Sequence, residues 1–419
     1  MDKMKVLYFH QHFCTPDGSA GIRSYGMSRR LIDKGHQVTV ICGSYLGAST
    51  GLTEPFTNGQ RRGCVDGIEV IEFDLGYSNS DGFIARVSTF MRYVFRSLKL
   101  VFTEKYDLIF ATTTPLTAGI PGIVARWLKN KPFVFEVRDL WPELPKEMGV
   151  ITNPIVLSLM SILEWVSYHS AHCVVALSPG IAKGVAKRGI APSNISLIPN
   201  GCDLDIFDVE VERWRPEQIS DTDLLVLFAG THGIANGLDS VLDAASELKS
   251  RGRLDIKFLF VGQGKLKSSL IDRAERDRLD NTIFHDPVSK MRLAGLMSAT
   301  DVGLQILANV PVFYYGTSPN KFFDYVSASL PVLNNYPGWL ADMINDNGCG
   351  FVVPPDDPVA FADALEEAAD NRAELKLKGD RGKALAVEQF DRQILADKWV
   401  GKLEAVYTKT GRKIAHEKN

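Results

Sequence analysis

The sequence lacks several features that would assign it at once to a class of protein. No apolar run reaches the ~18–20 residues that a membrane-spanning helix needs, and the N-terminal segment shows no signal-peptide pattern. The six cysteines form no CxxC pair, so we expect reduced, structural thiols in a cytosolic protein. Lys and Arg number 47 against 50 Asp and Glu, a formal charge of −3, which argues against a basic nucleic-acid surface.

Motifs for common cofactors are missing as well. The segment VGQG (261–264) is not followed by the Gly-Lys-Ser/Thr of a Walker motif or by the acid of a dinucleotide fingerprint. No Asp-x-Asp stands in a suitable loop after a predicted strand. We therefore expect neither a metal nor an organic cofactor.

Both halves of the chain alternate short apolar runs with helical patterns. A single core stops growing near ~250–300 residues, so a chain of 419 residues predicts two domains. Continuous apolar runs are typical of parallel strands that are covered on both faces. Such runs occupy 4–9, 37–42, 68–73, 107–112, 133–137, 172–177, 224–230, 256–262, 301–307, 330–335 and 349–353. The pattern predicts an α/β fold with two Rossmann-like, doubly wound domains in tandem.

Turn chemistry marks the boundary between the two domains. Pro, Asn-Gly and alternating Asp residues cluster in IPNGCDLDIF (198–207). We expect an N-terminal domain over 1–203 and a C-terminal domain over 204–390. The last helical pattern, 391–409, is expected to pack back on the N-terminal domain.

Three loops of the second domain follow predicted strands or open a helix, at 230–237, 261–267 and 314–325. Ligands of open parallel sheets bind beyond the carboxyl ends of the strands. Gly230 and Gly233 would let an anionic group approach the backbone closely. Each loop alone also fits an ordinary strand-to-helix turn, but the three together favour a phosphate-bearing ligand.

The third loop predicts a helix N-terminus that suits a phosphate. Ser318 is expected to be the N-cap and Pro319 the first helical residue. Lys321 would then lie in the first turn, beside free backbone N–H groups. Lys321 and Lys265 have an equally ordinary alternative as solvated surface charges.

Seen together, these segments resemble the family 4 glycosyltransferases of the GT-B fold. The subgroup that fits best is the L-fucosamine transferase type, which builds bacterial O-antigen and capsule repeats. The resemblance rests on 18–41, 136–145, 176–190, IPNGCDLDIF, 230–245, 260–270 and SPNKFFDYVSASLPVLNN (318–335).

For the donor, the resemblance places Asp324 where the family has the second of two glutamates, so Asp324 should bond the ribose hydroxyls. The first glutamate is replaced by Gly316. Relatives often carry an Arg and a Lys after the first strand of this domain, and GTHGIANG has neither, so Lys265 and Lys321 are expected to stabilise the leaving diphosphate. The expected donor-binding residues are Gly230, Thr231, Gly233, Gly264, Val288, Thr317, Ser318, Asn320 and Asp324.

For the acceptor, the resemblance points to the end of strand 133–137. Asp139 stands where relatives often have a His, and it is expected to be catalytic together with Lys321 and Lys265. A plain alternative is that Asp139 caps the helix that opens near 141–142. Gly21, Arg23 and Arg138 are the expected acceptor-binding residues.

Two helical segments of the first half have the composition of a membrane-facing surface. In 83–102, Arg92, Arg96 and Lys99 share one face of a helix that is otherwise rich in apolar residues. The segment 153–169 is apolar and poor in charge. The alternative is that both helices simply cover the sheet.

The resemblance implies a retaining enzyme. It would move a sugar, N-acetyl-L-fucosamine or another amino sugar, from a nucleotide, UDP above all, to a sugar linked to polyprenyl diphosphate. We expect a cytoplasmic protein, peripheral on the inner face of the bacterial plasma membrane. Two alternatives stay open: a non-hydrolysing UDP-sugar 2-epimerase, and an inert subunit that only binds nucleotide sugars.

Overall fold

The computed structural model describes residues 3–18, 20–45, 49–76, 82–207 and 211–417, and the chain divides into two compact units. The first unit consists of Met1–Pro199, Gly316–Ser318 and Gln393–Asn419. The second unit consists of Asn200–Tyr315 and Pro319–Arg392. This division lies a few residues before the boundary that we expected at 203/204.

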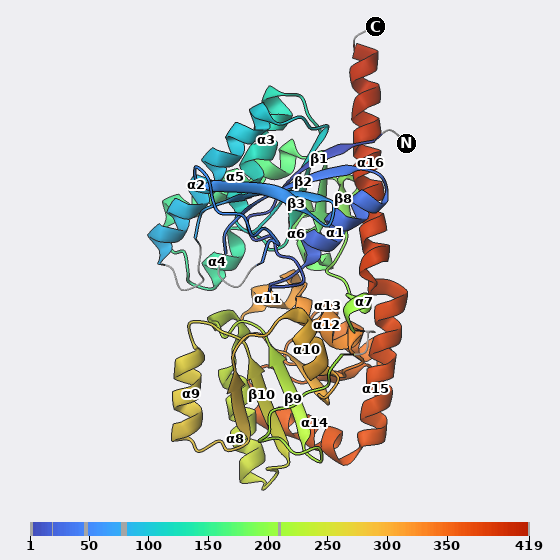
Figure 1. Cartoon of the computed structure of the whole chain (residues 1–419). Coiled ribbons are helices and arrows are strands. Elements are labelled where there is room, and N and C mark those ends of the chain that lie inside the picture. Colours follow the sequence, from blue (N-terminus) through green and yellow to red (C-terminus); the bar gives the residue numbers. More distant parts are fainter. Residues whose placement is uncertain (1–2, 19, 46–48, 77–81, 208–210, 418–419) are drawn as a thin grey trace. The chain divides into compact units, whose positions relative to one another are not determined.

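The first unit is built on an eight-stranded sheet with the order β3-β4-β2-β1-β5-β6-β7-β8. Strands β1, β2, β3 and β8 of this sheet are labelled in Figure 1. All neighbouring strands pair in parallel except β3 and β4. The six predicted strands are confirmed, and their apolar runs are buried because helices cover both faces. The strands are β1 (Lys5–Phe9), β2 (Gln37–Gly43), β3 (Gln60–Val65), β4 (Ile68–Phe73), β5 (Leu108–Thr112), β6 (Phe133–Val137), β7 (Cys173–Ala176) and β8 (Ile195–Leu197).

Helices follow most strands of the first unit. Helix α5 begins where the Asn153 side chain accepts hydrogen bonds from two backbone N–H groups. The end of α1 is followed by Gly35 in a left-handed conformation, as a helix C-terminus favours. The helices are α1 (Arg23–Asp33), α2 (Phe83–Thr103), α3 (Ile120–Leu128), α4 (Glu143–Glu147), α5 (Pro154–Ser170) and α6 (Pro179–Lys187).

The C-terminal helix α16 (Arg392–Glu417) belongs to the first unit from Gln393 onward. Its Trp399 is fully buried, with its ring 4.9 Å from the ring of Phe110. Asp397 forms an ion pair with Arg30 at 2.5 Å, and Glu404 accepts from or pairs with His36 at 3.0 Å. This helix therefore completes a core that the first half of the chain begins.

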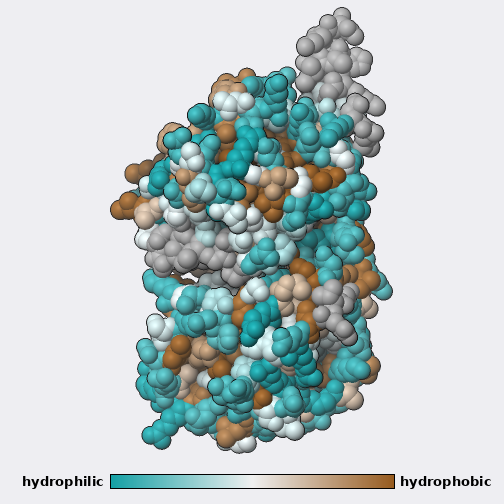
Figure 2. Space-filling view, in the orientation of Figure 1, coloured by the Kyte–Doolittle hydropathy of each residue, from teal (hydrophilic) through white to brown (hydrophobic). Residues whose placement is uncertain are grey.

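Helices α2, α3 and α5 pack side by side and expose many large apolar side chains. More than half of the exposed large hydrophobic side chains in the described chain lie on these three helices. In Figure 2, hydrophobic side chains gather at the edge of the first unit where Figure 1 places α2. We call this set the apolar helical surface: Ile84, Val87, Met91, Phe95, Phe102, Trp127, Leu128, Ile155, Leu159, Ile162 and Trp165. None of the described helices is both long and apolar enough to cross a membrane.

The second unit is built on a six-stranded, wholly parallel sheet with the order β11-β10-β9-β12-β13-β14. The strands are β9 (Leu224–Ala229), β10 (Ile256–Val261), β11 (Thr282–His285), β12 (Val302–Gln305), β13 (Val332–Asn334) and β14 (Gly350–Val352). The helices are α7 (Leu204–Phe207), α8 (Asp239–Ser250), α9 (Lys267–Arg276), α10 (Lys290–Met297), α11 (Pro311–Gly316), α12 (Asn320–Ser327), α13 (Trp339–Asn347), α14 (Pro358–Asp370) and α15 (Arg372–Leu385). The predicted fold, two doubly wound α/β domains, is confirmed.

The segment that enters the second unit and the segment that leaves it lie side by side. The Cys202 N–H donates to the Phe390 carbonyl at 2.7 Å, and the Arg392 N–H donates to the Cys202 carbonyl at 3.0 Å. The Arg392 guanidinium is buried and forms an ion pair with Asp203. Main-chain hydrogen bonds and a buried charge pair thus join the two passages.

Candidate active site

In the second unit, the loops after β9 and β10 interlock at the carboxyl edge of the sheet. The His232 N–H donates to the Gln263 carbonyl at 3.0 Å. A Cβ at Gly262 would lie 1.9 Å from the Gly230 oxygen, and a Cβ at Gly264 would lie 2.4 Å from the His232 oxygen. Only glycine fits such approaches, so these glycines hold two candidate ligand loops together.

Lys321 reaches this same edge from the first turn of α12. Its Nζ donates to Asn236 Oδ1 at 3.0 Å and lies 4.9 Å from the centre of the Phe228 ring. A Cβ built on Gly230 would lie 3.5 Å from this ammonium. Burial lowers the pKa of Lys321 to about 8, so the ammonium is still largely protonated at pH 7. A cation from a later segment therefore lies at the end of β9, where the loop itself supplies none.

The start of α12 differs from the prediction. The helix begins at Asn320, and extended Pro319 occupies the cap position without a side-chain hydrogen bond. The expectation that Ser318 is the N-cap and Pro319 the first helical residue is wrong by one position. Thr317 and Ser318 precede the helix, in the short stretch Gly316–Ser318 that belongs to the first unit.

Asp324, one turn further along α12, is buried and has a direct cationic partner that sequence reasoning missed. The Lys290 ammonium donates to Asp324 Oδ1 at 2.5 Å. Burial raises the pKa of Asp324, and the Lys290 charge opposes that rise. The two residues are 34 positions apart, and nothing in their spacing predicts the pair.

Of the two lysines after β10, the structure places Lys267 rather than Lys265 among the loops. Lys265 is exposed and, within the described part of the chain, forms no hydrogen bond or ion pair. The Lys267 ammonium donates to the carbonyls of Gly262 at 3.0 Å and His285 at 3.1 Å, and to Asp286 at 2.7 Å. The choice of Lys265 is not supported, because its side chain points to solvent.

The other expected donor residues lie on neighbouring loops. The Thr231 carbonyl accepts a hydrogen bond from the Asn236 amide at 2.7 Å, which shapes the loop after β9. Gly233 lies in this loop, where the space beside it is bounded by the Thr231 methyl group. Val288 is half-buried between β11 and α10, just before Lys290.

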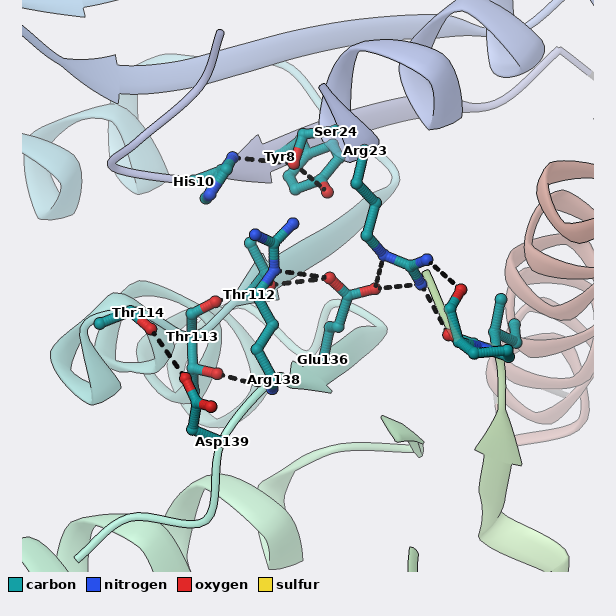
Figure 3. A network of polar contacts seen from close by, with 12 residues as sticks. Tyr8, His10, Arg23, Ser24, Thr112, Thr113, Thr114, Glu136, Arg138 and Asp139 are labelled. Carbon is teal, nitrogen blue, oxygen red and sulfur yellow. Dashed lines mark hydrogen bonds and ion pairs between the residues drawn. The ribbon is translucent and has the colours of Figure 1, made fainter. Parts of the chain in front are cut away.

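In the first unit, Arg23 and Glu136 form a fully buried ion pair (Figure 3). Arg23 Nε and Nη2 both donate to Glu136 Oε2, at 3.1 and 2.8 Å. The remaining Arg23 donors reach the carbonyls of Pro199 at 2.5 Å and Ile198 at 2.9 Å. The structure gives no support to the expectation that Arg23 contacts an acceptor, because the side chain is 1% exposed and its hydrogen bonds go to Glu136, Pro199 and Ile198.

Arg138, at the end of β6, is the more open of the two arginines. Its Nε donates to Thr112 Oγ1 at 3.1 Å and to Glu136 Oε1 at 3.3 Å. Its Nη2 is buried and has no hydrogen-bond partner within the described residues. Burial would raise the pKa of Glu136, but Arg23 and Arg138 together hold that pKa below its usual value. Arg138 therefore has one hydrogen-bond donor, Nη2, without a partner next to an ionised network.

His10 lies beside this network. The Ser24 hydroxyl connects the Tyr8 hydroxyl, 2.9 Å away, with His10 Nδ1, 2.8 Å away (Figure 3). Burial keeps the pKa of His10 well below its usual value, and the positive charge of Arg138 lowers it further. The imidazole is therefore neutral, and its environment is that of a core histidine.

Asp139 does not cap a helix. Helix α4 begins at Glu143, and its cap residue, Pro142, makes no side-chain hydrogen bond. Asp139 Oδ2 instead accepts from Thr114 Oγ1 at 3.5 Å (Figure 3). Burial raises the pKa of Asp139, against the opposing charge of Arg138. Gly21, the last of the expected acceptor residues, is exposed just before α1.

The structure thus gathers two polar groupings, one in each unit. The first holds Arg138 and Asp139 around Glu136, and the second holds Lys321 and Asp324 beside the glycine loops. Glu136 carried a signal in the sequence, because an acid inside the apolar strand FVFEV must find a buried partner. No pattern in the sequence pointed to Lys290 or Lys267.

Comparisons with known proteins agree with this architecture. A family model described as glycosyl transferase 4-like domain matches residues 18–201, and one described as glycosyl transferases group 1 matches residues 223–371. The probable glycosyltransferase WbjE of Pseudomonas aeruginosa is 23% identical over 313 residues, which cover 71% of this chain and 75% of that protein.

A second relative is the putative colanic acid biosynthesis glycosyl transferase WcaI of Escherichia coli. It is 26% identical over 156 residues, which cover 36% of this chain and 38% of that protein. Among solved structures, Anabaena HepE in complex with UDP-glucose superposes with a TM-score of 0.66 at 15% identity, covering 96% of this chain and all of that chain. With both domain models matched in order and the same two-domain fold, the chain belongs to the family 4 glycosyltransferases of the GT-B fold.

Proposed function

We propose that this glycosyltransferase moves a sugar from a nucleoside-diphosphate sugar, with uracil as the base, to a sugar linked to polyprenyl diphosphate in O-antigen or capsule synthesis. The observation that supports a nucleotide-sugar donor best is the placement of the Lys321 ammonium against Gly230, in the loop that interlocks with the second glycine loop. HepE, which was solved with UDP-glucose, supports uracil as the base. WcaI, named for colanic acid biosynthesis, supports a surface polysaccharide as the product.

In the proposed reaction the sugar keeps its anomeric configuration. The bond from the anomeric carbon to the diphosphate oxygen breaks, and the acceptor hydroxyl attacks from the same face. The departing phosphate oxygen takes the hydroxyl proton, so no protein base has to be consumed. Lys321 would stabilise the negative charge on the diphosphate, and Asp324 would accept hydrogen bonds from the ribose.

The first unit would bind the acceptor in this scheme. The Nη2 of Arg138 has no hydrogen-bond partner among the described residues and would donate to a phosphate or hydroxyl oxygen of the acceptor substrate. Asp139, half-buried with a raised pKa, would accept a hydrogen bond from a sugar hydroxyl and so orient it. These roles rest on positioning rather than on proton transfer by the protein.

A thermal-shift screen with a transfer assay tests the proposed function. We expect UDP and a UDP-sugar to raise the melting temperature, since a ligand at 100 times its Kd adds about 2.7 kcal/mol of stability. GDP and TDP should do so much less, and Asp324→Asn should abolish most of the shift. Stabilisation by GDP alone would exclude uridine, and an epimerised UDP-sugar without acceptor would favour the isomerase.

We also propose that the apolar helical surface lies against an anionic lipid surface. Helices α2 and α3 contain no acidic residue, and the single acid of α5, Glu164, is buried and paired with Arg188. Lys129 lies over the ring of exposed Phe102 and Arg126 over the ring of exposed Trp127, at 5.7 and 5.2 Å. Exposed aromatic rings with neighbouring cations and no acids are typical of proteins that insert side chains at a membrane interface.

Charge reversal on α2 tests this contact. Arg92→Glu with Lys99→Glu should reduce binding to anionic vesicles at least tenfold, because each cation near such a surface contributes about 1 kcal/mol. Arg96 is left intact, since it donates to the Gly59 carbonyl. Lys376→Glu with Lys398→Glu, both exposed elsewhere, is the matched control and should bind like wild type in a vesicle flotation assay. If both double variants lost vesicle binding to the same extent, the binding would be non-specific charge attraction and the proposed contact through α2 would be wrong.

A further inference from the structure

Asp324 is part of a buried group of four charges within the second unit. Its neighbours are Lys290 from the first turn of α10, Asp203 from the segment that enters the second unit, and Arg392 from the segment that leaves it. Asp203 and Asp324 are 3% and 8% exposed, and the side chains of Lys290 and Arg392 are each 10% exposed. Two acids and two cations make the group neutral, which is the condition under which charges are tolerated at this depth.

The contacts divide the four charges unequally. Arg392 is committed to Asp203, with a second contact from Nη2 to Oδ2 at 3.1 Å, and to the Gly201 carbonyl at 2.7 Å. Lys290 Nζ lies 2.5 Å from Asp324 Oδ1 and 3.7 Å from Asp203 Oδ2. The second oxygen of Asp324 has no partner within the described residues. Lys290 is therefore the cation in direct contact with Asp324, and it contacts one oxygen of the two.

We propose that Lys290 is a positioning residue that keeps the Asp324 carboxylate ionised and fixes its orientation, so that Oδ2 is presented to the ribose hydroxyls of the nucleotide. This inference rests on the proposed function for its ligand. Lys290 itself need not touch the nucleotide, because it acts through Asp324. The ring of Phe207, whose centre is 5.4 Å from the ammonium, covers Lys290 on another side and restricts its movement.

Among the described residues, each of the other cations around Asp324 is already bonded to another group; Arg392 is paired with Asp203, and only its Nη1 has no partner. Lys321, on the same helix, is held by Asn236, and Lys383 of α15 donates to the Ser327 carbonyl at 2.8 Å. Burial raises the pKa of the Cys202 thiol to about 12, so it stays neutral. Strands β12 and β13, which pack against α12, carry no titratable side chain. The charged or titratable groups that interact with Asp324 are thus Lys290, Asp203, Arg392, Lys321, Cys202 and Tyr325. Asp205 of α7 and Glu388, on other segments that pack against α12, are exposed.

Thermal unfolding at two pH values tests the inference without any nucleotide. In Lys290→Met the Asp324 carboxylate loses its cation, so its folded-state pKa rises and the protein gains stability as the pH falls and the acid takes up a proton. The loss of melting temperature relative to wild type should be several degrees at pH 8 and much smaller at pH 5.5. Adding Asp324→Asn, which mimics the protonated acid, should restore most of the loss at pH 8.

Nucleotide binding gives the second measurement. The UDP Kd of each variant is divided by that of Asp324→Asn at the same pH, which cancels the titration of the UDP phosphate. The affinity advantage is the factor by which a variant with an intact Asp324 binds UDP more tightly than Asp324→Asn does. In Lys290→Met this factor should fall about tenfold for each pH unit below the raised pKa of Asp324, whereas in wild type it should stay constant. Lys290→Arg should retain most of it. Lys257→Met, a half-buried lysine on β10 without an ion pair, is the matched control for both measurements.

The outcomes separate the alternatives. If Lys290→Met loses the same melting temperature at both pH values and Asp324→Asn restores nothing, Lys290 is only a packing residue and the inference is wrong. Rescue by Asp203→Asn instead would assign Lys290 to the other acid and would equally overturn it. If wild type fails to bind UDP, the proposed function fails, but the melting comparison still decides the role of Lys290.

Discussion

Lys321→Met should reduce kcat about 10²–10³-fold, the usual cost of removing a group that stabilises developing negative charge. The residue is the only described cation whose ammonium contacts the end of β9, where it is held by Asn236 and the ring of Phe228. The loop after β9 has no arginine or lysine that would take over its charge. Steady-state kinetics with a UDP-sugar and a lipid-linked acceptor measure the effect.

The same residue predicts a pH dependence. Burial lowers the pKa of Lys321 to about 8, so the ammonium loses its proton as the pH rises through 8. The value of kcat/KM, which reports the free enzyme, should therefore fall above pH 8 and stay level below it. Lys321→Arg should move this decline to higher pH, because an arginine keeps its charge.

Lys265→Met is the companion variant. Lys265 is exposed and has no partner in the described chain, so its loss should change kcat only a few-fold at most, as for a solvated charge. A large effect at Lys265 together with no effect at Lys321 would reverse the assignment of the two lysines.

Arg23→Met should destabilise the first unit by about 3–5 kcal/mol, because it leaves the Glu136 carboxylate buried with only one of its two cations. The wild-type pair is 1% and 0% exposed. Chemical denaturation, followed through the change in midpoint at constant slope, measures the loss. Arg276→Met, on an exposed side chain of α9, is the matched control and should change the midpoint little.

Two further measurements separate charge from packing at this pair. Arg23→Met combined with Glu136→Gln should cost less than Arg23→Met alone, since no uncompensated charge remains. The folded-state pKa of Glu136 lies below its unfolded value, so the pair stabilises the protein above the unfolded pKa and this contribution is lost as the pH falls through the folded one. A double variant as unstable as Arg23→Met at every pH would contradict the electrostatic account.

The sequence predicted most of the fold because parallel strands that are covered on both faces are continuous apolar runs. FVFEV and IEVIEF were found at their observed limits for this reason. Strand β3 was missed because QRRGCV is polar, and it is half-exposed at the antiparallel edge of the sheet. Short β8 and β11 were missed because neither is fully buried.

The site was predicted less well, because its contacts join segments that are distant in the sequence. The loops at 230 and 264 were found from glycines after strands, but the partner of Asp324 comes from α10, which has no motif. Arg23 was expected at a ligand because it follows a loop, yet the fold uses it to neutralise Glu136, 113 positions later. Sequence patterns report local geometry, and the pairing of buried charges is decided by topology.

The position of α16 sets an order on biosynthesis. Domains generally fold as they leave the ribosome, from the N-terminus onward. The first unit, however, receives Trp399 against Phe110 and Tyr8, and this tryptophan is translated only after the whole second unit. A nascent chain that stalls before residue 393 would expose the apolar side chains of the first unit that Trp399 covers to chaperones and proteases, whereas a chain extended through α16 covers them.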